Sequence, residues 1–199
     1  VKNDLLISGG TIASGILSPE GGDGTDIDIE AGSLVLSDRG GISSSTFNLG
    51  QGGDMLSGGN AGDISVRVAD SLTLRQGSLI RSIVRDNTFG KGGEVTIDAQ
   101  SLSLFGGSQI ASSVFTGNPG GQGDGGNLTI NVSEQVILSG VDSELGFSTA
   151  LLTVTERGAV GQAGEIDLNT SFLQVADGAI ISAQTENQSN AGIITINAD

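Results

Sequence analysis

The aliphatic residues of this chain recur in one pattern: Gly-x-Φ-x-Φ, where Φ is aliphatic, followed shortly by Leu-x-Leu or a similar pair. Its copies read GTDIDIEAGSLVL, GDISVRVADSLTL, GEVTIDAQSLSL, GNLTINVSEQVIL, GEIDLNTSFLQV and a shorter GIITINAD. The first aliphatic residues of successive copies are between 28 and 38 positions apart. This variation predicts a constant set of strands joined by a loop of variable length.

Within each repeat, aliphatic and polar residues alternate, which is typical of a half-buried strand. The first strand carries the inward pairs Ile27/Ile29, Ile64/Val66, Val95/Ile97, Leu128/Ile130, Ile166/Leu168 and Ile194/Ile196. The second carries Leu5/Ile7, Leu34/Leu36, Leu72/Leu74, Leu102/Leu104, Val136/Leu138 and Leu173/Val175. A third begins at Ile12, Ile42, Ile80, Ile110 and Ile181, and two positions later come the small residues Ser14, Ser44, Ser82, Ser112 and Ala183.

These series predict an all-β protein, a right-handed parallel β-helix (β-solenoid) with three strands per coil and about six partial or complete coils. We expect residues 1–199 to form a single solenoid domain, a segment of a longer repeat protein. Residues 147–156, FSTALLTVTE, fit the repeat poorly. They predict an extra strand or hairpin inserted at the loop edge.

The composition suits a narrow aliphatic core, because the chain has 34 glycines, 3% aromatic residues and neither Trp nor Tyr. The absence of Cys and His excludes disulfides, the usual zinc sites and nucleophiles activated by histidine. A net charge of −15 opposes binding to nucleic acid. No run of eighteen apolar residues is present, so we expect no membrane insertion.

One outward column of the first strand, Asp26, Asp63 and Glu94, places acids on consecutive coils. We call these three residues the acidic column. Carboxylates roughly 5 Å apart repel one another, and a hard cation such as Ca²⁺ would bridge them. A solvated face explains the same residues. We therefore expect no cofactor beyond weak, multi-site calcium binding at the acidic column.

A second outward column contains Glu30, Arg67, Asp98, Asn131, Asn169 and Asn197. Arg67 falls between two acids, so exposed ion pairing there is expected. The three asparagines predict an amide ladder, in which stacked side chains hydrogen-bond to one another along the solenoid.

Nothing in the sequence marks a catalytic residue. The acids would serve a polysaccharide lyase or hydrolase, but paired catalytic carboxylates need a pocket that raises the pKa of one of them. The six phenylalanines are scattered and form no evident sugar platform. A polysaccharide-active β-helix is therefore kept as the alternative to a non-enzymatic protein.

Three phrases, Gly-Asn-Leu-Thr-Ile-Asn-Val, Ser-Leu-x-Leu-x-x-Gly-x-x-Ile and Ser-Ser-Thr-Phe, resemble the repeats of filamentous haemagglutinin-like exoproteins of the two-partner secretion type, especially cyanobacterial ones. The resemblance implies a right-handed β-helical shaft with an adhesive or structural role. It also implies passage through an outer-membrane transporter to the surface or exterior of a Gram-negative bacterium. Surface glycans, other cells or further copies of the chain are the expected partners.

No functional residue is carried over from that family, since the matching motif is scaffold. A surface-layer or filament subunit that stacks end to end is a further alternative. Because the strand faces resemble scaffold, we expect recognition on the variable loops, residues 46–62, 114–126 and 147–163.

Overall fold

The computed structural model describes residues 3–17, 22–47, 58–85, 88–115, 122–156 and 159–198. Within these ranges the protein is all-β and contains no helix. Every pairing between its named strands is parallel, and the strands form two sheets. The prediction of an all-β protein built from stacked parallel strands, an arrangement typical of a β-solenoid, is confirmed.

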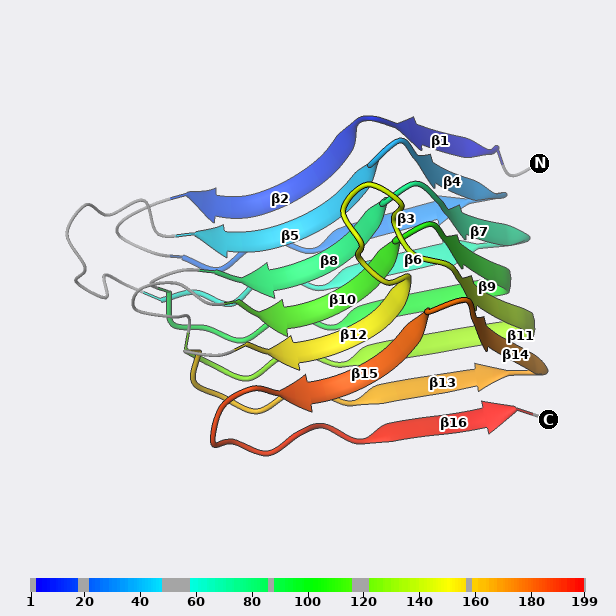
Figure 1. Ribbon diagram of the computed structural model, residues 1–199. Coiled ribbons are helices and arrows are strands. Elements are labelled where there is room, and N and C mark those ends of the chain that lie inside the picture. The colour runs from blue at the N-terminus through cyan, green and yellow to red at the C-terminus, as the bar shows by residue number, and fades with distance from the viewer. Residues whose placement is uncertain are drawn as a thin grey trace.

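The larger sheet has ten strands. They are β1 (Leu5–Ser8), β3 (Ile27–Ala31), β4 (Leu34–Ser37), β6 (Ile64–Val68), β7 (Ser71–Leu74), β9 (Val95–Phe105), β11 (Leu128–Ser139), β13 (Ile166–Thr170), β14 (Phe172–Ala176) and β16 (Ile194–Ala198). The smaller has the order β2 (Thr11–Leu17), β5 (Gly41–Phe47), β8 (Leu79–Val84), β10 (Gln109–Val114), β12 (Ala150–Thr155) and β15 (Ile180–Thr185). Figure 1 shows both sheets as stacks that run from the N-terminus to the C-terminus.

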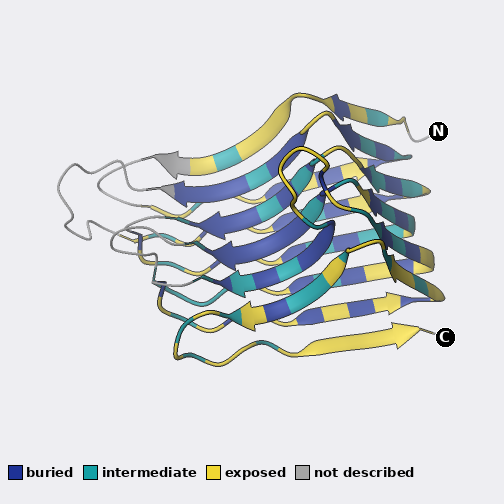
Figure 2. Ribbon diagram, viewed as in Figure 1, coloured by how far each residue is buried: buried dark blue, intermediate teal, exposed yellow. Residues whose placement is uncertain are grey.

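The registers of the predicted strands are confirmed residue by residue. In the first series, Ile64 pairs with Ile27 and Val95, and Leu128 pairs with Val95 and Ile166. The other two series pair in the same manner. In the inner strands of the larger sheet, inward residues are dark blue in Figure 2 and alternate with less buried ones. At the ends of the stack the prediction of buried side chains is wrong for Ile12, Val175, Ile194 and Ile196, which are exposed because no further strand covers them. Each fully buried Leu, Ile or Val side chain contributes roughly 1.5–3 kcal/mol by leaving water.

Residues 150–155 form β12, which lies between β10 and β15 in the smaller sheet instead of at the loop edge. Leu151 pairs with Ile110 and Ile181, so it is the third-strand residue of its repeat. The irregular segment precedes it: a small hairpin closes through an antiparallel bridge between Val141 and Ser148. We call residues 140–149 the clasp. The clasp lengthens the connection between β11 and β12, so β12 begins later than the repeat spacing predicts. For that reason the sequence pattern predicts an extra strand where the structure has a regular one.

Close approach of the main chain explains part of the glycine content. A Cβ atom on Gly93 would lie 2.2 Å from the carbonyl oxygen of Gly62, and one on Gly126 would lie 2.2 Å from that of Gly93. Real Cβ atoms do not come so near to a backbone oxygen. Only glycine therefore fits where the loops turn into the first strands.

The small residues of the third strand also have a polar role. The hydroxyl of Ser82 donates to the carbonyl of Gly62 at 3.0 Å and accepts from the amide of Gly93 at 2.9 Å. Ser112 repeats this arrangement with Gly93 and Gly126, at 2.8 and 2.9 Å. Both serines are fully buried. We call this chain of contacts the serine–glycine spine, and it connects the third strands to the loops that precede the first strands.

Candidate functional site

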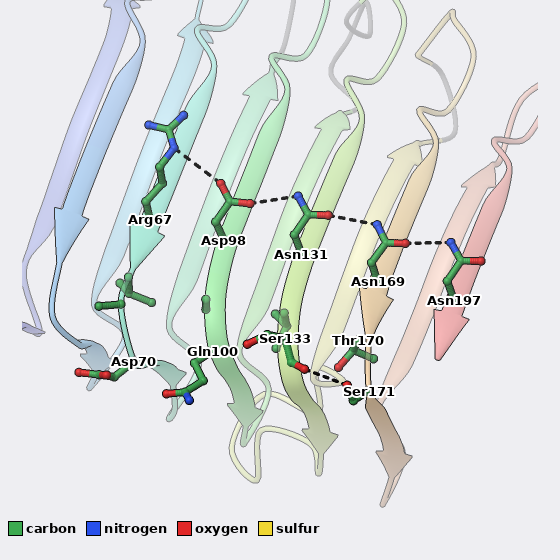
Figure 3. A pocket seen from close by; sticks show the side chains of 14 residues that line it. Arg67, Asp70, Asp98, Gln100, Asn131, Ser133, Asn169, Thr170, Ser171 and Asn197 are labelled. Atoms are coloured by element: carbon green, nitrogen blue, oxygen red, sulfur yellow. Dashed lines mark hydrogen bonds and ion pairs between the residues drawn. The ribbon is translucent and has the colours of Figure 1, made fainter. Parts of the chain in front are cut away.

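A polar groove runs across the stack where the first-strand series meets the second. Its lining comes from β6, β9, β11, β13, β16 and the turns that follow them, and its volume is about 880 Å³. Figure 3 labels the principal side chains: Arg67, Asp70, Asp98, Gln100, Asn131, Ser133, Asn169, Thr170, Ser171 and Asn197. The strands shift register between Val132 and Gln135 within the groove, which interrupts the regular outer face of β11.

A row of side chains hydrogen-bonds along one wall of this groove (Figure 3). Nδ2 of Asn131 donates to Oδ1 of Asp98 at 3.0 Å, and Nδ2 of Asn169 donates to Oδ1 of Asn131 at 3.1 Å. Nδ2 of Asn197 then donates to Oδ1 of Asn169 at 2.8 Å. The predicted amide ladder is confirmed. Its rungs follow the spacing of parallel strands, about 4.8 Å.

Arg67 ends the ladder, with its Nε 3.6 Å from Oδ2 of Asp98. The predicted exposed ion pairing of Arg67 is confirmed for Asp98. Both side chains are largely exposed, so the pair contributes only about 0–1 kcal/mol to stability. The amides themselves retain hydrogen-bonding capacity, because each carboxamide has two N–H donors and two acceptor lone pairs and the ladder uses at most one of each.

The opposite side of the groove carries hydroxyl and amide groups. Ser171 donates from its hydroxyl to the carbonyl oxygen of Ser133 at 2.8 Å. Nε2 of Gln100 donates to Glu134 at 2.8 Å. The lining therefore offers neutral donors and acceptors, with one cation and two carboxylates, Asp70 and Asp98. Asp98 is already engaged by Arg67 and Asn131. This chemistry suits recognition of an extended polar chain better than hydrolysis, which uses a pair of free carboxyl groups.

The acidic column lines a separate, small hollow of about 230 Å³. The amide of Asp63 donates to Oδ1 of Asp26 at 2.9 Å, and the amide of Glu94 donates to Oδ1 of Asp63 at 2.7 Å. Asn127 accepts from the amide of Glu165 in the same way, at 2.9 Å. Two of the three acids thus accept a hydrogen bond from the next repeat. In the part of the chain that the structure describes, no group of three or more acidic residues is placed to hold a metal. Weak calcium binding stays a prediction.

Another hollow, of about 500 Å³, lies beside the glycine-rich turns and contains Lys91, Glu94, Asp124 and Glu165. Glu94 accepts a hydrogen bond from Thr129 at 3.1 Å, and Asp124 accepts one from the amide of Gln162 at 3.0 Å. These contacts position the carboxylates. They also use part of the acceptor capacity that a catalytic pair would need.

The clasp folds back over the turns of earlier repeats, and Figure 1 shows it in yellow, rising between β11 and β12 toward the N-terminal strands. Two acids of the clasp pair with Arg39 of an earlier turn: Asp142 lies 3.5 Å from Arg39, and Glu144 lies 2.8 Å from it. Backbone amides of Leu145 and Glu144 donate to the Asp142 carboxylate and, with Arg39, hold its pKa below the ordinary aspartate value. The clasp therefore joins turns that are distant in sequence.

The loops predicted to carry recognition, 46–62, 114–126 and 147–163, lie partly outside the described residues. None of the residues that the structure describes in these loops lines the groove. The sequence predicts the Asn column but not the groove around it. The groove forms where the first-strand and second-strand series lie side by side, and neither series alone contains that information. The unusual spacing after Val132 was the available signal.

No protein-family model, curated protein or solved structure matches this chain. Over the described ranges, no helix is long and apolar enough to cross a membrane.

Proposed function

We propose that this chain is a non-enzymatic structural and adhesive segment of an extracellular bacterial protein, and that it binds an extended neutral polar polymer, such as a glycan, along the groove. The observation that carries this proposal is the amide ladder. It repeats hydrogen-bonding groups at a constant spacing over several strands, while an enzyme concentrates its chemistry at one point.

The finer architecture belongs to the same proposal. Three strands per coil are supported by the element order, in which β3, β4 and β5 are followed by β6, β7 and β8 in matching registers. The right-handed winding is proposed from a general rule for parallel strands. Right-handed crossovers are the rule between parallel strands. Such a shaft presents long, regular faces, as an adhesive or surface-structural protein requires.

The resemblance to filamentous haemagglutinin-like exoproteins supports the location and export route. We place the protein at the surface or exterior of a Gram-negative bacterium, reached through an outer-membrane transporter. A chain without cysteine suits this route, since no disulfide would have to form after transport.

Glycan-array binding followed by calorimetry tests the proposal. The double variant Asn131→Ala and Asn169→Ala removes two adjacent rungs and should weaken binding at least about ten-fold, the loss expected for two hydrogen bonds. Gln174→Ala changes an exposed amide on β14 outside the groove and should bind like the wild type. If the wild type binds no glycan, or if the double variant binds as tightly, the groove is not the recognition surface.

The hollow that contains Glu94, Asp124 and Glu165 favours a second function, a polysaccharide-active β-helix. Incubation with neutral and acidic polysaccharides distinguishes the two. If the wild type releases unsaturated or newly reducing sugars and Glu165→Gln does not, turnover occurs at this hollow. That result would overturn the non-enzymatic proposal. We expect binding without product.

A further inference from the structure

The outer face of the smaller sheet contains an apolar slot over β10. Ile80, Ile110 and Leu151 point into the core, so the residues that alternate with them face outward. In register across β8, β10 and β12, these outward residues are Arg81, Ala111 and Leu152. Because β10 carries the small residues, a hollow of about 270 Å³ opens between its larger neighbours. Figure 1 shows these three strands side by side.

The walls of this slot are mainly aliphatic and aromatic. Leu79, Leu152, Val154 and Ile180 line it, with Phe115 toward the end of β10. Phe147 reaches the slot from the clasp, and the carbonyl of its neighbour Ser148 accepts a hydrogen bond from Gln109 at 3.1 Å. The slot thus has a defined floor, two walls and an aromatic side chain contributed by a separate segment.

Arg81 is the feature that gives the slot a chemical preference. Its Nε is buried without a hydrogen-bond partner, and none of the described residues forms an ion pair or hydrogen bond with its guanidinium. Burial, together with the nearby Arg85, lowers the pKa of Arg81. Acidic residues outnumber basic ones by 23 to 8, and both Arg39 and Arg67 have carboxylate partners. Arg81 thus differs from Arg39 and Arg67, because the described residues supply no carboxylate to its half-buried guanidinium.

The acids nearest to the slot lie at its far end. Glu156 and Glu186 line that end, and Glu156 is four residues beyond Leu152 on the strand line of β12. Four residues of strand span about 13 Å, which exceeds the screening length of about 8 Å at physiological ionic strength. A carboxylate placed at Arg81 would not meet strong repulsion from these residues.

We propose that this slot binds a medium-chain aliphatic carboxylate. The carboxylate accepts hydrogen bonds from the Arg81 guanidinium, whose planar fork matches a carboxylate, and the alkyl chain lies over Ala111 and Ser113. The volume holds about nine groups of the size of a water molecule, at roughly 30 Å³ each, which is the size of an octanoate chain. This site is independent of the groove and of its polymer ligand.

Calorimetric titration of the whole chain with sodium octanoate tests the proposal. Arg81→Met keeps the apolar surface and removes the charge, so we expect octanoate to bind at least about ten-fold more weakly. Arg81→Lys keeps the charge but loses the planar fork, so its affinity for octanoate should lie between that of the wild type and that of Arg81→Met. Arg75→Met, at an exposed arginine outside the slot, is the matched control and should bind as the wild type does. Circular dichroism establishes that each variant is folded.

A second arm uses 1-octanol, which has the same chain and no carboxylate. It should bind more weakly than octanoate and should be unaffected by Arg81→Met. Ala111→Leu fills the floor of the slot and should reduce the binding of both compounds. The proposal is overturned if octanoate shows no saturable binding, if Arg81→Met binds it as tightly as the wild type, or if octanol binds as well as octanoate.

Discussion

Replacing Ser112 with alanine tests whether the serine–glycine spine holds the loops against the strands. Ser112 is fully buried, and its hydroxyl both donates to the carbonyl of Gly93 and accepts from the amide of Gly126. Ser112→Ala removes both contacts with little change in volume. The buried carbonyl oxygen of Gly93 and the half-buried amide of Gly126 then lose this partner.

The magnitude follows from the two groups left behind. Each unsatisfied buried polar group costs about 1–3 kcal/mol, so the full sum for two groups is about 2–6 kcal/mol. Because the Gly126 amide is only half-buried, we expect the free energy of unfolding to fall by the lower part of this range, about 2–4 kcal/mol. For a chain of this length, that corresponds to a decrease in Tm of roughly 4–16 °C. The loss of stability should be greatest in the repeats next to Ser112, because the stability of a repeat protein is close to a sum of contributions from neighbouring repeats.

Urea denaturation followed by circular dichroism measures this loss, and amide hydrogen exchange at Gly126 localises it. Ser103→Ala is the matched control. Ser103 is a half-buried serine of β9 outside the spine, and its loss should change the stability by no more than about 0.5 kcal/mol. If Ser112→Ala is no more destabilising than Ser103→Ala, the hydroxyl serves only to limit side-chain volume, and the polar role assigned to the spine is wrong.

Gly126→Ala places a Cβ atom 2.2 Å from the Gly93 carbonyl oxygen and should prevent folding or cost more than about 3 kcal/mol, whereas Gly146→Ala, with positive φ but no atom within 4 Å, should cost about 1–2 kcal/mol. Thermal denaturation of both variants separates close approach from backbone conformation. Calorimetric titration with Ca²⁺ should show at most weak, multi-site binding, and one tight site would contradict this. The lowered pKa of Asp142 contributes stability above the ordinary aspartate pKa of about 3.9 that is lost as the pH falls through the lowered value. Asp142→Asn should therefore make acid unfolding less steep in that range, and an unchanged acid titration would show that this carboxylate contributes nothing.

Strand registers could be predicted from the sequence because alternation and stacking impose the same requirement on every repeat. Ile64, Val95 and Leu128 had to lie above one another if each was to be buried. Leu151 could not be placed in this way, because the clasp separates it from the strand that normally precedes it. The Leu151 side chain follows the alternation of the third strand, but its position along the chain does not follow the repeat spacing.

The amide ladder could be predicted as well, since Asn131, Asn169 and Asn197 occupy equivalent positions in successive repeats. The groove and the slot could not. Both depend on the meeting of segments that have separate sequence patterns: two strand series in the first case, and the smaller sheet with the clasp in the second. A repeat pattern predicts contacts along a column, but contacts between columns depend on how the chain bends.

The high acidity of the chain is partly a consequence of its scaffold. Asp23, Asp26, Asp63 and Asp124 each accept a hydrogen bond from a backbone amide of the next repeat, and Asn60 and Asn127 do the same without a charge. The position requires a short side chain with an acceptor oxygen, so aspartate and asparagine are equivalent there. Acids at these positions therefore do not indicate a ligand. Better indications of recognition are polar groups that the scaffold leaves with spare capacity, which here are the amide edges of the groove and the guanidinium of Arg81.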